Sequence, residues 1–221
     1  METKIISVAN HKGGGGKTTT VASVGSILAS QGHRVLMIDM DAQANLTSSI
    51  LNGDPESTVY SALMGNESLP IASLSENLFL VPASLQLSMA ELELASAMAR
   101  ERILSELLEP VKGEFEYVLI DCPPSLGLLT LNALTASTDI VIPLVVEVLP
   151  FKGLTMMNCF ISMVMVNLQD VLLRQSSDSL LHYLFRSLVA HKGIILDDSH
   201  LVGIVLQHSL SVEMAHITQV H

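Results

Sequence analysis

Short apolar runs alternate along this chain with longer segments whose apolar residues recur at helical spacing. The runs predict strands at residues 5–9, 35–38, 78–81, 117–120, 140–146 and 201–206. The longer segments predict helices at residues 18–30, 59–64, 87–108, 128–135, 151–167 and 172–189. The first strand, helix and second strand form one unit within about forty residues, and a crossover through a helix implies parallel strands. The pattern therefore predicts an α/β fold, a doubly wound, mostly parallel sheet with helices on both faces.

The amino-acid composition agrees with this fold and limits the classes of protein to which the chain can belong. Apolar residues make up 49% of the 221 residues and aromatic residues only 4%, a mixture that suits parallel strands covered on both faces. No apolar run reaches the roughly 18–20 residues that a membrane span needs. The N-terminus lacks the basic start and cleavage site of a secretory signal. We therefore expect a soluble, cytoplasmic protein that does not bind membranes.

Charge and cysteine usage restrict the candidate ligands. The formal net charge is −11, from 22 acidic and 11 basic residues, and the basic residues form no stripe. Strong nucleic-acid affinity depends on clustered Lys and Arg, so the charge pattern does not support DNA binding. Cys122 and Cys159 lack a metal-binding spacing, and we interpret them as small buried apolar residues. Six of the eight histidines lie at residues 182–221 without regular ligand spacing, which favours surface positions over a metal site.

Residues 12–19, with the sequence KGGGGKTT, carry the strongest chemical signal. A glycine-rich loop between a strand and a helix lets backbone N–H groups converge on a polyphosphate at the helix N-terminus. Lys17 would reach the β- and γ-phosphates, and the Thr18 hydroxyl would coordinate Mg²⁺. A glycine-rich turn without a ligand is the less favoured interpretation. The predicted cofactors are ATP and Mg²⁺, and the predicted nucleotide-binding residues are Lys12, Gly13, Gly14, Gly15, Gly16, Lys17, Thr18 and Thr19.

Acidic residues follow two of the predicted strands. Asp39 and Asp41 begin a D-x-D-x-Q-x-N pattern after the second strand, and Asp121 follows residues 117–120. Parallel strands end at one edge of the sheet, so these acids are expected near the glycine-rich loop. Asp121 would then hold Mg²⁺, mostly through water. A solvated aspartate at a strand end is the alternative for each of them.

The second lysine of the loop makes the pattern more specific. A strict Walker A loop has Gly where this chain has His11, and Lys12 follows one position later. This deviant Walker A loop resembles that of the ParA/MinD (Soj-like) family of P-loop ATPases, most closely its ParA-type partition members. The resemblance implies that Lys12 reaches the ATP of a partner subunit in a homodimer. It also implies that Asp41 positions the attacking water and that Asp39 supports the water shell of the metal.

The candidate site residues follow from the motifs and this resemblance together. The candidate catalytic residues are Lys12, Lys17 and Asp41, and the candidate metal site consists of Thr18, Asp39 and Asp121. Relatives usually carry Val or another side chain where this loop has Gly15. A fourth consecutive glycine adds conformational freedom, so we expect weaker nucleotide binding than with Val at this position.

The resemblance also implies a function. It predicts a slowly hydrolysing switch ATPase that dimerises around ATP in plasmid or chromosome partition, stimulated by a ParB-like partner. Nonspecific DNA binding would belong to that role, although charge does not support it. A nucleotide-binding scaffold that does not cycle and a MinD-like positioning ATPase are the alternatives. A metabolic enzyme with the same loop, such as a reductase iron protein or an amidotransferase-like synthetase, is disfavoured. The iron protein would need cluster-ligating cysteines.

The resemblance covers only part of the chain. We assign residues 1–166 to a P-loop ATPase core and residues 167–221 to a C-terminal part of the same domain. That C-terminal part does not follow the family pattern. A truncation, a divergent segment or a degenerate reading frame would each explain the difference. Its end is not a basic amphipathic helix, which disfavours membrane targeting.

Overall fold

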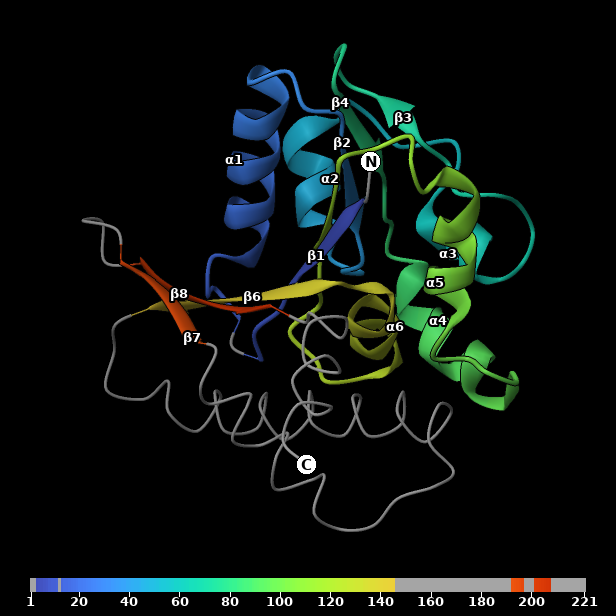
Figure 1. Ribbon diagram of the computed structural model, residues 1–221. Coiled ribbons are helices and arrows are strands. Elements are labelled where there is room, and N and C mark those ends of the chain that lie inside the picture. The colour runs from blue at the N-terminus through green and yellow to red at the C-terminus, as the bar shows by residue number, and fades with distance from the viewer. Residues whose placement is uncertain (1–2, 12, 146–191, 197–200, 208–221) are drawn as a thin grey trace, which may run out of the picture.

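A single mixed sheet organises the molecule (Figure 1). The computed structural model describes residues 3–11, 13–145, 192–196 and 201–207. Its strands, in chain order, are β1 (Lys4–Val8), β2 (Val35–Asp39), β3 (Ala72–Ser73), β4 (Leu78–Val81), β5 (Tyr117–Asp121), β6 (Asp139–Val145), β7 (Lys192–Leu196) and β8 (Leu201–Gln207). They are ordered β3-β4-β2-β5-β1-β6-β8-β7. The strands from β4 to β6 in this order are parallel, whereas β3, β8 and β7 pair antiparallel at the two edges.

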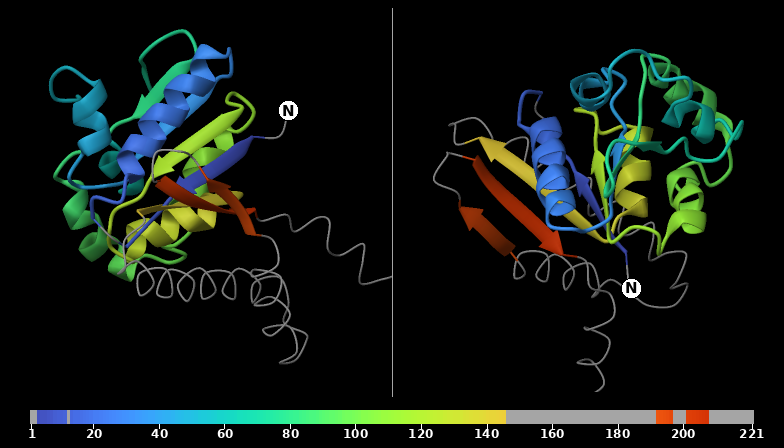
Figure 2. Two further views of the ribbon diagram at one scale, coloured as in Figure 1. Left: turned by 90° about the vertical axis from the view of Figure 1, so that its left-hand side faces the viewer. Right: turned by 90° about the horizontal axis from the view of Figure 1, so that it is seen from above.

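Helices cover both faces of the sheet, which confirms the predicted fold class (Figure 2). The α-helices are α1 (Lys17–Ser30), α2 (Asn45–Ile50), α3 (Val59–Leu63), α4 (Leu87–Glu93), α5 (Ile103–Leu108) and α6 (Leu128–Ala136). Short 3₁₀ segments follow α4 at Leu94–Ser96 and α5 at Glu109–Val111. Helices α1 and α2 pack on one face, and α3 to α6 pack on the other.

Alternation along the central strands builds the two halves of the core. In β2, Val35 and Met37 join the cluster that contains α1, whereas Leu36 and Ile38 join the cluster that contains α3 to α6. All five residues of β2 are buried, which explains why its sequence is a continuous apolar run. The sheet is therefore rigid on both faces, and its edge can hold loops in fixed positions.

The prediction of one helix over residues 87–108 is wrong. The chain leaves the helix after α4 and its 3₁₀ extension, and α5 begins only at Ile103. Ala99 adopts a left-handed conformation with φ of 51°, which a continuous helix does not allow. Asn132 of α6 holds the break, because its side chain accepts from the N–H of Leu104 (3.1 Å) and donates to the carbonyl of Arg100 (2.8 Å). A long-range contact thus overrides the helical spacing.

The remaining predicted elements agree with the structure wherever it describes them. The six predicted strands correspond to β1, β2, β4, β5, β6 and β8, with bounds shifted by one residue at most. Helix α2 and strands β3 and β7 are additional to the prediction. The predicted helices at residues 151–167 and 172–189 lie outside the described residues. No helix among the described residues combines the length and apolar character that a membrane crossing requires.

Candidate functional site

The carboxyl ends of β1, β2 and β5 meet at one edge of the sheet. Asp121 is the register partner of Val8 on one side and of Asp39 on the other. The pairing continues one residue further, since Met40 N–H donates to the Asp121 carbonyl (2.9 Å) and Cys122 N–H donates to the Val8 carbonyl (3.2 Å). The loops that leave these three strands therefore begin side by side.

The glycine-rich loop joins β1 to α1 at this edge. Gly14 and Gly16 have φ of 72° and 82°, a left-handed backbone that favours glycine. Gly16 precedes the first turn of α1, so Lys17 and Thr18 stand at the helix N-terminus. Lys17 is buried, with 7% of its surface exposed. Lys12 lies outside the described residues, and its predicted role stays a prediction.

The loop also contacts the segment that follows β5. His11 Nδ1 lies 3.0 Å from the carbonyl oxygen of Pro124. This contact brings the residue before the glycine-rich loop against the segment that follows Asp121. The chain segments next to two of the predicted motifs are thus in direct contact.

Asp121 is buried close to the Thr18 hydroxyl. Its side chain is 1% exposed, and neither carboxylate oxygen has a hydrogen-bond partner among the described residues. Burial raises the pKa of Asp121 to about 7; the nearby Thr18 hydroxyl and Lys17 ammonium lower this pKa, and the charges of Asp39 and Asp41 raise it. Buried carboxylates normally have partners, so this orphaned group is poised for a cation.

Asp39, its neighbour on β2, accepts hydrogen bonds at both of its carboxylate oxygens. Its Oδ1 accepts from Asp41 N–H (3.1 Å), and its Oδ2 accepts from the N–H (2.9 Å) and hydroxyl (2.7 Å) of Thr47. Burial raises the pKa of Asp39, and these hydrogen bonds oppose the rise. The predicted contribution of Asp39 to the metal's water shell is not tested by these contacts.

Asp41 is more accessible than either. It is partly buried, and its Oδ1 accepts from Gln43 N–H (3.0 Å). Its charge raises the pKa of both Asp39 and Asp121, so the three acids share one electrostatic environment. The structure thus brings together five of the predicted site residues, namely Lys17, Thr18, Asp39, Asp41 and Asp121.

The donor set fits Mg²⁺ in the presence of a polyphosphate. No group of three or more His, Cys, Asp or Glu residues that could hold a metal occurs in the described part of the chain. Mg²⁺ at phosphate sites needs only one or two protein ligands, because phosphates and waters complete its octahedron. Asp121, whose carboxylate oxygens are buried and lack a partner in the described part of the chain, offers that arrangement together with the nearby Thr18 hydroxyl.

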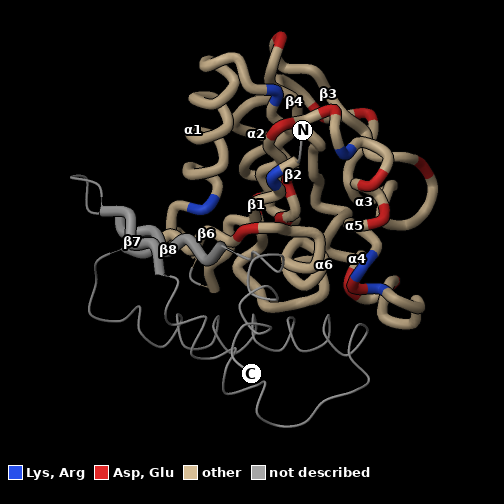
Figure 3. Tube along the Cα trace, in the orientation of Figure 1, with Lys and Arg blue, Asp and Glu red and all other residues tan. Residues whose placement is uncertain are grey.

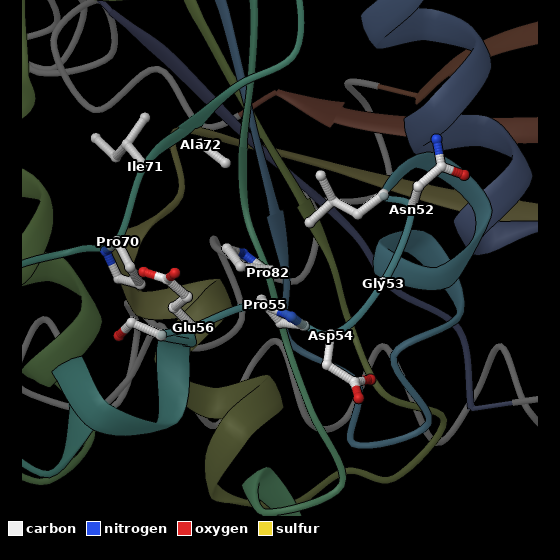
Figure 4. Close-up of a pocket in the computed structure, with 11 residues that line it drawn as sticks. Asn52, Gly53, Asp54, Pro55, Glu56, Pro70, Ile71, Ala72 and Pro82 are labelled. Atoms are coloured by element: carbon white, nitrogen blue, oxygen red, sulfur yellow. The ribbon is translucent and has the colours of Figure 1, made fainter.

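Two further features lie near this edge. A pocket of about 350 Å³ is lined by residues 51–57, residues 70–72 and Pro82, and it contains none of the predicted site residues (Figure 4). Cys122 is fully buried, and burial raises the pKa of its thiol to about 12. This cysteine therefore stays protonated, in agreement with its predicted role as a small apolar residue. Cys159 lies outside the described residues.

Sequence reasoning missed Thr47. Thr47 is 3% exposed and contacts Asp39 with both its backbone N–H and its hydroxyl. Its position, eight residues after Asp39 in a short helix, carries no signal as strong as the glycine-rich loop. The sequence offers one clue to this contact, a threonine that follows an acidic strand end by a few residues.

Comparison with known proteins agrees with this geometry. A family model described as an AAA domain matches residues 3–173. Over 157 residues the chain is 47% identical to the sporulation initiation inhibitor protein Soj of Bacillus subtilis, covering 69% of this chain and 62% of Soj. The chain belongs to the ParA/Soj family of P-loop ATPases. It spans about 60% of the length of the curated relatives that it matches.

Solved structures of similar proteins share the fold. The cobyrinic acid a,c-diamide synthase of Mycobacterium smegmatis, with bound ATP analogue and magnesium, has a TM-score of 0.70 at 42% identity, over 73% of this chain and 68% of that one. A plasmid partition protein of Borrelia burgdorferi has a TM-score of 0.67 at 26% identity, over 84% and 87% of the two chains. The fold that positions the candidate site is therefore shared with these solved structures.

Proposed function

We propose that this chain is an Mg²⁺-dependent ATPase that acts as a molecular switch. It binds ATP at the glycine-rich loop, dimerises around the nucleotide and hydrolyses it slowly. The observation that carries the proposal is the buried Asp121 carboxylate, which has no hydrogen-bond partner within the described ranges by geometry. It lies beside Lys17 and Thr18 at the edge that also presents Asp41. A buried carboxylate without a partner lowers the stability of the folded protein, and a bound cation would offset that loss.

The loop residues have distinct roles in nucleotide binding. The backbone N–H groups of residues 13–16 and of Thr19 surround the phosphates at the positive end of α1. Lys17 neutralises the β- and γ-phosphates, and its burial removes competing water from that contact. Thr18 and Asp121 hold Mg²⁺, with Asp39 close by on the next strand.

Hydrolysis then requires a positioned water and stabilised charge. Bound Mg²⁺ supplies positive charge that neutralises the triphosphate. Asp41, the most accessible of the three acids, orients the attacking water. Lys12 of one subunit reaches the phosphates held by the other, so dimerisation completes the site. These contributions are mainly positioning and electrostatics, as expected for phosphoryl transfer.

The proposed cellular role is based on the similar proteins. The matched proteins include chromosome-partitioning and plasmid-partition proteins, which supports a role in partition with a stimulating ParB-like partner. Basic residues of the described part are dispersed over the molecule instead of forming a stripe (Figure 3). The described residues therefore do not offer a basic stripe to a DNA backbone.

Turnover measurements test the enzymatic proposal. Mg²⁺-dependent ATPase activity is measured with and without DNA for the native chain, Asp41→Ala and the control Asp54→Ala, whose aspartate is exposed in a separate loop. We expect slow turnover in the native chain and the control, and loss of roughly 10²-fold or more in Asp41→Ala. Nucleotide binding without turnover in the native chain would instead support a scaffold that does not cycle.

Molar mass in solution tests the dimer. Light scattering after size-exclusion chromatography is compared in ADP and in a nonhydrolysable ATP analogue, for the native chain and for Lys12→Ala. We expect a dimer only for the native chain with the ATP analogue. A native chain that binds the analogue and stays monomeric overturns the sandwich mechanism.

A further inference from the structure

Thr47 connects three segments through one side chain. Its hydroxyl donates to Asp39 Oδ2 (2.7 Å) and accepts from Ala83 N–H (2.9 Å), and its own N–H donates to the same Asp39 oxygen (2.9 Å). Thr47 and Asp39 are both buried, at 3% and 0% exposure. The end of β2, helix α2 and the segment after β4 therefore meet at one threonine.

The chemistry of this junction requires a hydroxyl. A hydroxyl has one proton and two lone pairs, and here the proton is directed to a carboxylate while a lone pair receives a backbone N–H. Ala83 is 1% exposed, so its N–H would otherwise be buried without an acceptor. Valine has the same shape as threonine but can replace neither bond, whereas serine can replace both.

The junction closes a loop around Asp41. Asp39 holds the start of the loop through Asp41 N–H and its end through Thr47. Within the loop, Gln43 N–H donates to Asp41 Oδ1 (3.0 Å), and Ala44 N–H donates to the Asp41 carbonyl (2.9 Å). Ala44 has φ of 50°, a conformation that non-glycine residues keep only where the surroundings enforce it. The bonds at both ends supply that enforcement.

We propose that Thr47 is a positioning residue that fixes the loop of residues 40–46, and so the Asp41 carboxylate, through Asp39. The part concerning turnover rests on the proposed ATPase function. The glycine-rich loop leaves a different strand and makes none of these bonds, so nucleotide affinity should depend little on Thr47. Misplacing a water-orienting group by about 1 Å can cost roughly 10²-fold in rate.

The test compares Thr47→Val with Thr47→Ser and with a matched control. Thr58→Val makes the same exchange at a buried threonine whose hydroxyl has no partner among the described residues. For each variant we measure amide hydrogen exchange of residues 40–46, with β5 amides as an internal reference. The dissociation constant for a nonhydrolysable ATP analogue and the turnover at saturating ATP are measured in parallel.

We expect Thr47→Val to raise exchange at residues 40–46 at least about tenfold relative to β5. Its nucleotide affinity should stay within about twofold of the native value, while turnover falls roughly tenfold or more. Thr47→Ser and Thr58→Val should match the native chain in all three measurements. If Thr47→Val does not fold, Thr47→Ala, which adds no misplaced methyl group, carries the same comparison.

Two results would overturn the proposal. Native exchange at residues 40–46 in Thr47→Val would show that the hydroxyl does not hold the loop. A serine variant as impaired as the valine variant would show that packing of the methyl group matters instead. A native chain without turnover contradicts the proposed ATPase function alone, because the exchange comparison still decides whether Thr47 fixes the loop.

Discussion

The ends of β2 and β5 present two aspartates side by side in opposite surroundings. Asp39 and Asp121 are register partners on parallel strands, and both are almost completely buried. Asp39 accepts three hydrogen bonds, whereas Asp121 accepts none from the described residues. The difference separates two surroundings of a buried carboxylate: Asp39 is hydrogen-bonded within a loop of the protein, and Asp121 is the one that we propose binds a cation.

The largest expected effect is that of Asp121→Asn. Asparagine carries no charge for Mg²⁺, so turnover should fall roughly 10²–10³-fold. The same change removes an ionised, unpaired carboxylate from the interior at pH 8, above its pKa of about 7, and should stabilise the ligand-free protein by roughly 1 kcal/mol. Urea unfolding in EDTA and turnover in Mg²⁺ measure the two effects. A less stable variant would mean that Asp121 has a structural partner after all.

Asp39→Asn should act in the opposite direction on stability. Its amide can accept through one oxygen only, so donors from Asp41 and Thr47 compete for it and at least one stays unpaired. We expect a loss of about 2–3 kcal/mol in the free energy of unfolding, measured by urea denaturation. Asp54→Asn, at an exposed position, is the control and should change stability by less than about 0.5 kcal/mol. Equal effects of Asp39→Asn and Asp121→Asn would remove the distinction drawn above.

Much of this edge is predictable from sequence, because its signals are local. The glycine-rich loop, the acid after each strand and the strands themselves are contiguous patterns, and parallel pairing brings their ends together. What distinguishes Asp39 from Asp121 is not local. It depends on Thr47, eight residues further along the chain, and on Ala83, which is separated from Thr47 by 36 residues. The family resemblance places both acids at the metal site, and the spacing of the sequence cannot find the junction at Thr47.

The break between α4 and α5 has the same cause. Residues 87–108 keep helical spacing throughout, so the sequence predicts one helix. Asn132, 28 residues beyond Leu104, supplies the hydrogen bonds that make the interruption favourable. Tertiary hydrogen bonds of this kind outweigh a helix propensity of a few tenths of a kcal/mol per residue.

Asn132→Ala extends the comparison to a hydrogen-bonded side chain that lies away from the three aspartates. Its side chain also donates to the Leu128 carbonyl (3.0 Å), but that carbonyl keeps its backbone bond within α6 in the variant. The substitution therefore leaves the N–H of Leu104 and the carbonyl of Arg100 without their partner. We expect a loss of about 2 kcal/mol in the free energy of unfolding. Affinity for a nucleotide analogue, measured by fluorescence titration, should be unchanged. A loss of affinity would imply that α6 helps to hold the segment after Asp121.

Gly15→Val should give the smallest effect of the four substitutions. It tests the affinity for the nucleotide that we propose binds beside Asp121. Gly15 is not among the loop glycines with positive φ, so a side chain is compatible with its backbone, unlike at Gly14. Valine restricts the free loop and should tighten binding of an ATP analogue by about 0.5–1 kcal/mol, roughly two- to fivefold. Gly14→Val is the matched control and should weaken binding, since its φ is 72°. Isothermal titration of both variants decides the point: unchanged or weaker binding in Gly15→Val would show that the fourth glycine does not loosen the loop.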